Sequence, residues 1–116
     1  MSLDAQLFAA LSPLVNGEVY PDVAPDGVAR PYITYQQVGG DVVNYTEGSI
    51  PDRRNARVQI NVWAETRLGA SSLSELVEDT LRPITELQTS VIGARASVYE
   101  PETKLRGARQ DFSIWY

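Results

Sequence analysis

The clearest hydrophobic pattern in the chain lies in residues 57–64, where apolar and polar side chains alternate. A period of two predicts a β-strand that buries one face, because successive side chains of a strand point to opposite faces. A shift of one residue would bury the polar set, so the pairing register is strongly specified. The predicted core side consists of Val58, Ile60, Val62 and Ala64, and the polar side of Arg57, Gln59, Asn61 and Trp63. Trp63 is the largest side chain of the segment, so its place on the polar side requires an explanation.

Three more segments have the composition or the alternation of strands. Residues 31–38 are rich in β-branched and aromatic residues, but both faces are similarly apolar, so the pattern leaves open which one is buried. Residues 89–100 and 107–116 alternate at a period of two. In the last segment the polar side is formed by Arg109, Asp111, Ser113 and Trp115. A second tryptophan therefore lies among polar side chains.

Apolar residues recur at spacings of three and four in two segments, which predicts two amphipathic helices. Ser2 can cap the first helix, and Pro13 predicts its end near Ser12. Thr66 can cap the second helix, and Pro83 ends it. We expect both apolar stripes to pack on the sheet. They consist of Leu3, Leu7, Phe8, Leu11 and Leu14 in the first helix, and of Leu68, Leu73, Leu76, Val77, Thr80 and Leu81 in the second.

These segments predict a single α+β domain over residues 1–116, in the order helix, strand, strand, helix, strand, strand. Two hairpins give an antiparallel sheet of about four main strands, with the two helices packed on one face. Residues 18–30 contain closely spaced Pro and Gly, which predicts an ordered loop with Val19-Tyr20 as a short edge pairing. A sheet that is covered on one side leaves its other face open to water.

A long polar connection precedes the strand at residues 57–64. After a bend or bulge at Gly39-Gly40, residues 41–45 are expected to continue the first main strand. Residues 46–54 exceed the roughly two to five residues of most hairpin loops, which predicts a functional projection or a mobile tip. The connection ends in Asp52, Arg53 and Arg54. The adjacent arginines either contact an acidic partner or form a solvated charge pair.

The composition argues against most catalytic and metal chemistry. The chain of 116 residues has no cysteine and no histidine. Thiolate nucleophiles, disulfides, the commonest metal ligand and the residue most used for proton transfer near neutral pH are thereby absent. Asp22 and Asp26 are conceivable metal ligands, but aspartates beside Pro and Gly more often shape turns. We predict no catalytic residue, no cofactor and no metal, and an enzyme is the third hypothesis for function.

Charge and hydropathy narrow the set of partners. With 43% hydrophobic and 22% charged residues, the chain is an ordinary globular sequence that can fold without disulfides. Its net charge of −5 argues against broad contact with nucleic-acid backbones, which requires clustered lysine and arginine. No apolar run approaches the roughly 20 residues that span a bilayer, and the N-terminus lacks the features of a signal peptide. We expect no membrane partner, no specific nucleic-acid binding, and action in the cytoplasm.

Several short motifs resemble those of a known family, the small tail-completion or tail-to-head joining proteins of long-tailed bacteriophages and prophages. The resemblance covers most of the chain, from about Leu3 to Leu81, and the C-terminal hairpin adds little to it. The motifs are Gly17-Glu18-Val19-Tyr20-Pro21-Asp22, Ala24-Pro25, Arg30-Pro31-Tyr32-Ile33-Thr34-Tyr35, and the strand at residues 57–64 followed by a helix.

The resemblance implies a structural virion protein, assembled in the bacterial host cytoplasm. Such proteins form a ring, commonly hexameric, at the head-proximal end of the tail tube, where they stop tube growth and offer a surface to the head–tail connector. The implied partners are further copies of the chain, the tail tube protein and the connector protein. The family has no catalytic residues to transfer to this sequence.

The predicted contacts with these partners lie on the open sheet face and in the loop at residues 41–54. Interfaces are enriched in aromatic residues and arginine, and tryptophan is a favoured hot-spot residue. The alternative is that each tryptophan covers a sheet edge or packs under the long loop. The second hypothesis for function is a small cytoplasmic ligand- or peptide-binding adaptor that uses the same face. The predicted interface residues are Arg57, Gln59, Asn61, Trp63, Arg109, Asp111, Trp115, Asp52, Arg53 and Arg54.

Overall fold

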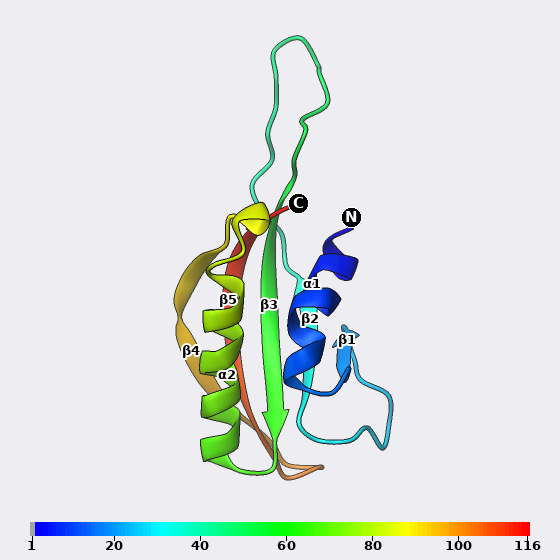
Figure 1. The fold of residues 1–116 in the computed structure, drawn as a ribbon, viewed down its shortest axis with the longest axis vertical. Helices are drawn as coiled ribbons and strands as arrows, with labels where there is room; N and C mark the ends of the chain where they lie inside the picture. Colours follow the sequence, from blue (N-terminus) through cyan, green and yellow to red (C-terminus); the bar gives the residue numbers. More distant parts are fainter. Residues whose placement is uncertain (1) are drawn as a thin grey trace.

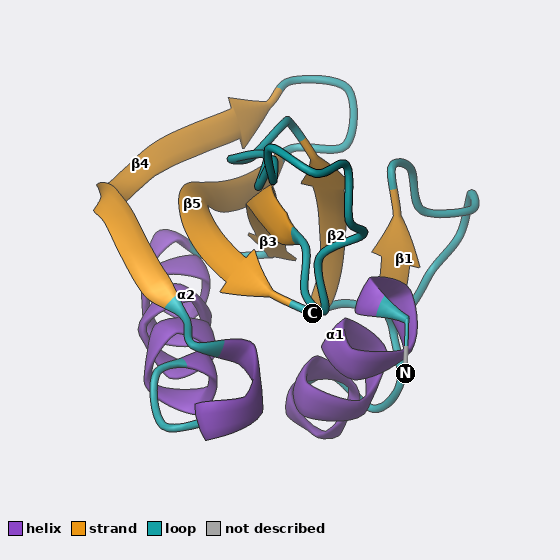
Figure 2. Cartoon of the chain, turned by 90° about the horizontal axis from the view of Figure 1, so that it is seen from above, coloured by secondary structure: helices purple, strands orange, loops and turns teal. Residues whose placement is uncertain are grey.

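Two helices cover one face of a five-stranded sheet in the computed structural model, which describes residues 2–116 (Figures 1 and 2). The predicted α+β class and the two helices on one face are confirmed. The elements are α1 (Leu3–Leu11), the 3₁₀ turn η1 (Ser12–Leu14), β1 (Val19–Pro21), β2 (Tyr32–Gln37), β3 (Asn55–Ala64), α2 (Arg67–Leu81), the 3₁₀ turn η2 (Thr85–Leu87), β4 (Ser90–Glu100) and β5 (Leu105–Trp115).

The sheet is mixed, with the strand order β1-β2-β3-β5-β4. Its β2–β3, β3–β5 and β5–β4 pairs are antiparallel, as predicted. The four main strands are β2 to β5, and the expected short edge pairing at Val19-Tyr20 is confirmed as β1. The prediction of an antiparallel sheet is wrong at this edge, because β1 is parallel to β2, with Val19 opposite Ile33. A strand of three residues gives no pattern that indicates the direction of its pairing.

The strand at the centre of the sheet is β3. It pairs with β5 over its whole length, from Asn55 opposite Trp115 to Ala64 opposite Arg106. Val58, Ile60 and Val62 are buried, and the same face of β5 adds the buried residues Ala108, Gln110, Phe112 and Ile114. The sequence pattern does not decide which face of β2 is buried. The structure shows that it is the face with Ile33 and Tyr35, which belong to the core.

Both helices begin at the predicted caps, where Ser2 Oγ accepts from Ala5 N at 3.1 Å and Thr66 Oγ1 from Gly69 N at 3.0 Å. The buried stripe is narrower than predicted. It consists of Leu3, Leu7 and Leu11 in α1 and of Ala70, Leu73, Ser74, Val77 and Leu81 in α2. Phe8, Leu68 and Leu76 are exposed, so their prediction as core is wrong. Phe8 follows Leu7 and Leu76 precedes Val77, and neighbours on a helix differ by about 100° in direction, so only one of each pair faces the sheet.

The connection between β2 and β3 projects from the body as a long loop (Figure 1). The strand ladder ends with Val38 N bonded to Arg57 O and Arg57 N bonded to Gly39 O, both at 2.8 Å. The predicted continuation of the strand through residues 41–45 is wrong, because these residues have no strand pairing. Gly40 explains the break. It has a φ of +142°, and a Cβ atom there would lie 2.4 Å from Asn55 O, so only glycine allows the chain to turn away at this point.

Candidate assembly interface

A charged cluster lies on the open face of β3 and β5. The guanidinium of Arg57 contacts Asp111 through both Nε and Nη2, each 2.8 Å from Oδ2. Gln59 Nε2 donates to Asp111 Oδ1 at 3.4 Å. The Asp111 side chain is only 16% exposed, so the cluster holds a largely covered carboxylate. Three predicted interface residues are thereby brought together in one fixed group.

The next pair along the same face joins Asn61 and Arg109, which are also opposite each other in the β3–β5 register. Arg109 Nε donates to Asn61 Oδ1 at 3.0 Å. Among the described residues 2–116, no carboxylate lies within ion-pair distance of Arg109. The exposed Arg109 therefore presents a positive charge that the chain itself does not neutralise.

Trp63 lies at one end of this face and is half-buried. Its ring stacks on Tyr32, with centroids 6.5 Å apart and an interplanar angle of 29°. Its Nε1 donates to Thr34 Oγ1 at 3.4 Å. A Cβ atom at Gly107 would come within 2.8 Å of the indole ring, so the tryptophan lies directly over the glycine. The ring is held in place by its own sheet and still offers part of its surface to a partner.

Trp115 lies at the other end of the sheet, opposite Asn55 in the register. The ten residues of β3 that separate the two ends span about 30 Å, so the two tryptophans do not form one patch. Trp115 lines a hollow beside the loop, together with Val43, Tyr45, Pro51, Asp52, Arg53 and Gln88. This position matches the alternative in which a tryptophan packs under the long loop.

The base of the loop is firmly attached to the sheet. Backbone groups of Arg54 and Tyr116 exchange two hydrogen bonds, at 2.8 and 2.9 Å. Asn55 Oδ1 accepts from Asp41 N at 2.8 Å, and Asn55 Nδ2 donates to Ser113 Oγ at 2.8 Å. The Arg53 guanidinium donates to the carbonyl oxygen of Glu86. Arg53 is therefore bound within the chain, whereas Arg54 is exposed.

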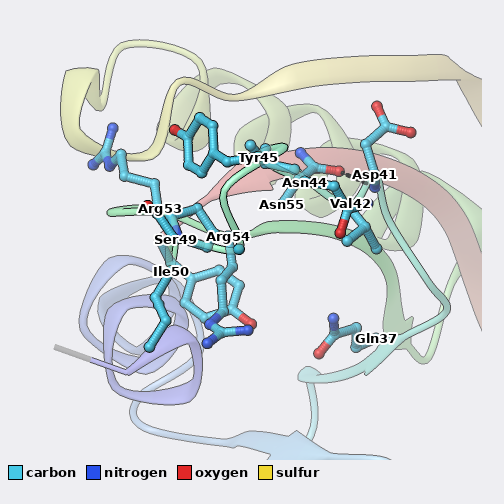
Figure 3. A pocket seen from close by; sticks show the side chains of 14 residues that line it. Gln37, Asp41, Val42, Asn44, Tyr45, Ser49, Ile50, Arg53, Arg54 and Asn55 are labelled. Atoms are coloured by element: carbon cyan, nitrogen blue, oxygen red, sulfur yellow. Dashed lines mark hydrogen bonds between the residues drawn. The ribbon is translucent and has the colours of Figure 1, made fainter.

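Above this base the two arms of the loop enclose a hollow of about 430 Å³ (Figure 3). The lining combines apolar and charged side chains, among them Val42, Tyr45 and Arg54. Three apolar residues of this lining are also exposed to solvent, Val42 to 80%, Ile50 to 79% and Tyr45 to 47%. Exposed apolar side chains gathered on one projecting loop are typical of a surface that contacts a partner.

Sequence patterns missed several residues of this surface. The composition of residues 31–38 does not show which face Tyr32 lies on, although Tyr32 is the stacking partner of Trp63. Asn55 precedes the regular alternation, and nothing in the pattern shows that it joins the loop to β5. The structure also places Ile92 and Tyr99, two exposed apolar side chains, on β4.

Within residues 2–116 no group of three or more His, Cys, Asp or Glu side chains is placed to hold a metal ion. Neither described helix is both long and apolar enough to cross a membrane.

Comparison with known proteins identifies the family. Among solved structures, a chain described as "Virion of native gene transfer agent (GTA) particle" is similar in fold, with a TM-score of 0.60 and 19% sequence identity over 96% of this chain and 89% of that chain. No curated protein matches the sequence. The family model described as tail completion protein gp17 matches residues 5–116. The chain therefore belongs to the tail completion protein gp17 family, as the sequence motifs predict, and is a structural protein of a phage-type virion.

Proposed function

We propose that the protein caps the head-proximal end of the tail tube and joins the tail to the head, as an oligomeric ring assembled in the bacterial host cytoplasm. The observation that supports this role is the loop at residues 41–54, which combines an anchored base with exposed apolar side chains. Val42 and Ile50 would each contribute about 1.5–3 kcal/mol to the free energy of binding if a partner buried them fully. The tail tube protein, the connector protein and neighbouring copies are the proposed partners, and a hexamer is the proposed ring.

The open sheet face supplies the second proposed contact surface. Its Arg57–Asp111–Gln59 cluster and its Asn61–Arg109 pair are already ordered in the single chain, so little side-chain entropy is lost on binding. The complete proposed set is Arg57, Gln59, Asn61, Trp63, Arg109, Asp111 and Trp115 with the loop residues Asp52, Arg53 and Arg54. The role is structural and uses no catalysis, no cofactor and no nucleic-acid sequence.

Mixing purified protein with tail tubes tests the capping role, with tube length and end structure followed by electron microscopy. The protein should bind one end of each tube and stop further growth. Ile50→Asp should lose this activity, because it places a charge where an apolar contact forms. Leu68→Asp is the matched control, since Leu68 is exposed to 78% on α2, far from the loop, and this variant should cap normally. A parent protein that never binds tube ends and stays monomeric at high concentration would contradict the proposal.

Replacing the tryptophans separates an interface role from a core role. Trp63→Ala and Trp115→Ala should each weaken capping while thermal unfolding stays cooperative, because both rings are half-buried and neither belongs to the core cluster. The control is Phe112→Ala, which removes a fully buried ring and should lower stability by about 3–5 kcal/mol. If a tryptophan variant instead loses cooperative unfolding, that tryptophan stabilises the fold and leaves the proposed interface.

A further inference from the structure

The long loop contains a segment of strand-forming sequence that pairs with no other strand. Residues 41–45 are Asp-Val-Val-Asn-Tyr, in which β-branched and aromatic residues favour extended structure. In the described chain, no backbone hydrogen bond involves Val42, Val43 or Asn44. The segment nevertheless runs as an extended arm away from the body (Figure 1). The backbone donors and acceptors of Val42, Val43 and Asn44 are therefore free to pair with another strand, whereas Asp41 N and Tyr45 O are already bonded within the chain.

The edge strand β4 also lacks a strand partner, on its outer side. One side of β4 pairs with β5, and its outer side has no strand neighbour, because β4 is last in the sheet order. A bulge between Ile92 and Ala96 interrupts the pairing, and the following stretch, Ala96 to Glu100, pairs with β5 without a shift. The opposite edge of the sheet is a poorer template, because β1 has only three residues and ends in Pro21. The regular half of β4 has the same length as residues 41–45.

Within one chain, residues 41–45 cannot pair with the regular half of β4. The loop leaves the sheet at the Asn55 end of β3, whereas the regular half of β4 lies at the Ala64 end, since Ala64 is opposite Arg106 and Arg106 is opposite Tyr99. The two ends of β3 are about 30 Å apart, and Figure 1 shows the loop pointing away from the β4–β5 turn. The loop therefore cannot reach this edge of its own chain, whereas the loop of another copy can.

We propose that residues 41–45 of one copy add as a strand to residues 96–100 of the next copy, and that this head-to-tail contact closes the ring; the inference rests on the proposed ring. A head-to-tail contact between unlike surfaces gives a closed ring when its rotation closes. Strand addition gives affinity through backbone hydrogen bonds, as in other recognition by sheet edges. The same contact places Val43 next to Val98.

Charge selects the direction of the added strand. In a parallel alignment Asp41 lies next to Ala96 and close to Arg95, whose present partner Glu75 is 3.2 Å away and largely exposed. In an antiparallel alignment Asp41 would lie opposite Glu100, and like charges in that position are destabilising. We therefore assign the parallel alignment. Val43 lies opposite Val98 in both alignments, which gives a test of pairing that does not depend on direction.

Cysteine cross-linking tests the contact, and the chain has no cysteine of its own. Val43→Cys protein, isotope-labelled, is mixed with unlabelled Val98→Cys protein, assembled on tail tubes and treated with a short thiol cross-linker. Mass spectrometry should show labelled chains joined to unlabelled ones. Tyr45→Cys with Glu100→Cys should also cross-link, and Asp41→Cys with Glu100→Cys should not. The control pair, Val43→Cys with Leu68→Cys, should give no product.

Proline substitutions test the same contact through the backbone. Successive N–H groups of a strand point to opposite sides, so either Val42→Pro or Val43→Pro must remove a hydrogen bond to β4. At least one of these variants should lose ring formation. Thr46→Pro is the matched control, because Thr46 follows Tyr45 in a turn closed by Gly48 N to Tyr45 O at 3.0 Å, a position that favours proline. It should assemble normally.

The outcomes separate this inference from the proposed function. Rings that form with both proline variants, or cross-links from Val43 to Leu68 that equal those to Val98, would overturn the strand addition and leave the capping role intact. A parent protein that forms no ring and binds no tube end would overturn both.

Discussion

Single side chains join elements that are far apart in the sequence, and Tyr35 is an example. Its hydroxyl on β2 donates to Asp4 Oδ1 on α1 at 2.6 Å. Burial of the ring, and then this hydrogen bond, raise the pKa of Tyr35 well above its ordinary value of about 10. The folded chain therefore keeps the phenol proton at a pH where the unfolded chain loses it. Stability linked to Tyr35 is complete below pH about 10 and is lost as the pH rises above that value.

Tyr35→Phe should lower the free energy of unfolding by about 1–2 kcal/mol at neutral pH, through the lost hydrogen bond to a charged acceptor. It should also make the decline of stability above pH about 10 shallower. Some decline will remain, because the pKa values of Tyr20 and Tyr32 are also raised. Urea unfolding at a series of pH values measures both effects. Tyr45→Phe, at the exposed loop tip, is the control, and equal alkaline slopes for parent and Tyr35→Phe would contradict the argument.

Elements differ in how well the sequence predicts them. The alternation of β3 and β5 correctly assigned every residue from Arg57 to Ala64 to a face, because each strand has one buried and one open side. In α2 the periodicity could not choose between the adjacent Leu76 and Val77. Residues 41–45 have strand composition and no partner, so local preference was right about extended backbone and wrong about pairing. Sequence patterns also located the polar side of the sheet, but cross-strand pairs such as Arg57 with Asp111 depend on a register that no single strand specifies.

Capping of α2 gives a prediction at the scale of one element. Thr66→Ala removes the side-chain acceptor for Gly69 N and should cost about 1 kcal/mol of stability. Ser72→Ala, on the exposed side of the same helix, is the matched control and should be neutral or slightly stabilising, because alanine is the better helix former. Thermal unfolding of both variants measures the difference. A Thr66→Ala protein as stable as the parent would mean that water replaces the cap at no cost.

The whole molecule is elongated, with extents of 52 × 25 × 25 Å, and the projecting loop accounts for the long dimension (Figure 1). No residue of the loop belongs to the core cluster. The stability of the body should therefore depend little on the loop, although the base of the loop is hydrogen-bonded to the sheet.

Replacing residues 42–51 by Asn-Gly should consequently change the stability of the single chain by less than about 1 kcal/mol, since shortening a flexible loop alters its closure entropy only slightly. The same variant should no longer cap tail tubes. Calorimetry and electron microscopy measure the two properties on one preparation. A large fall in unfolding temperature would instead show that the loop stabilises the body.

The pairing of β3 with β5 has a consequence for how the chain folds. These central strands are separated in sequence by α2 and β4, yet β5 supplies Phe112 and Ile114 to the core. Contacts between residues so far apart slow folding, because a long loop must close before they form. On the ribosome, the first helix and β1 to β3 emerge with an unfilled core and with one edge of β3 unpaired. We expect this half-made sheet to be the state most prone to aggregation, and chaperone binding to nascent chains should cease once β5 has emerged.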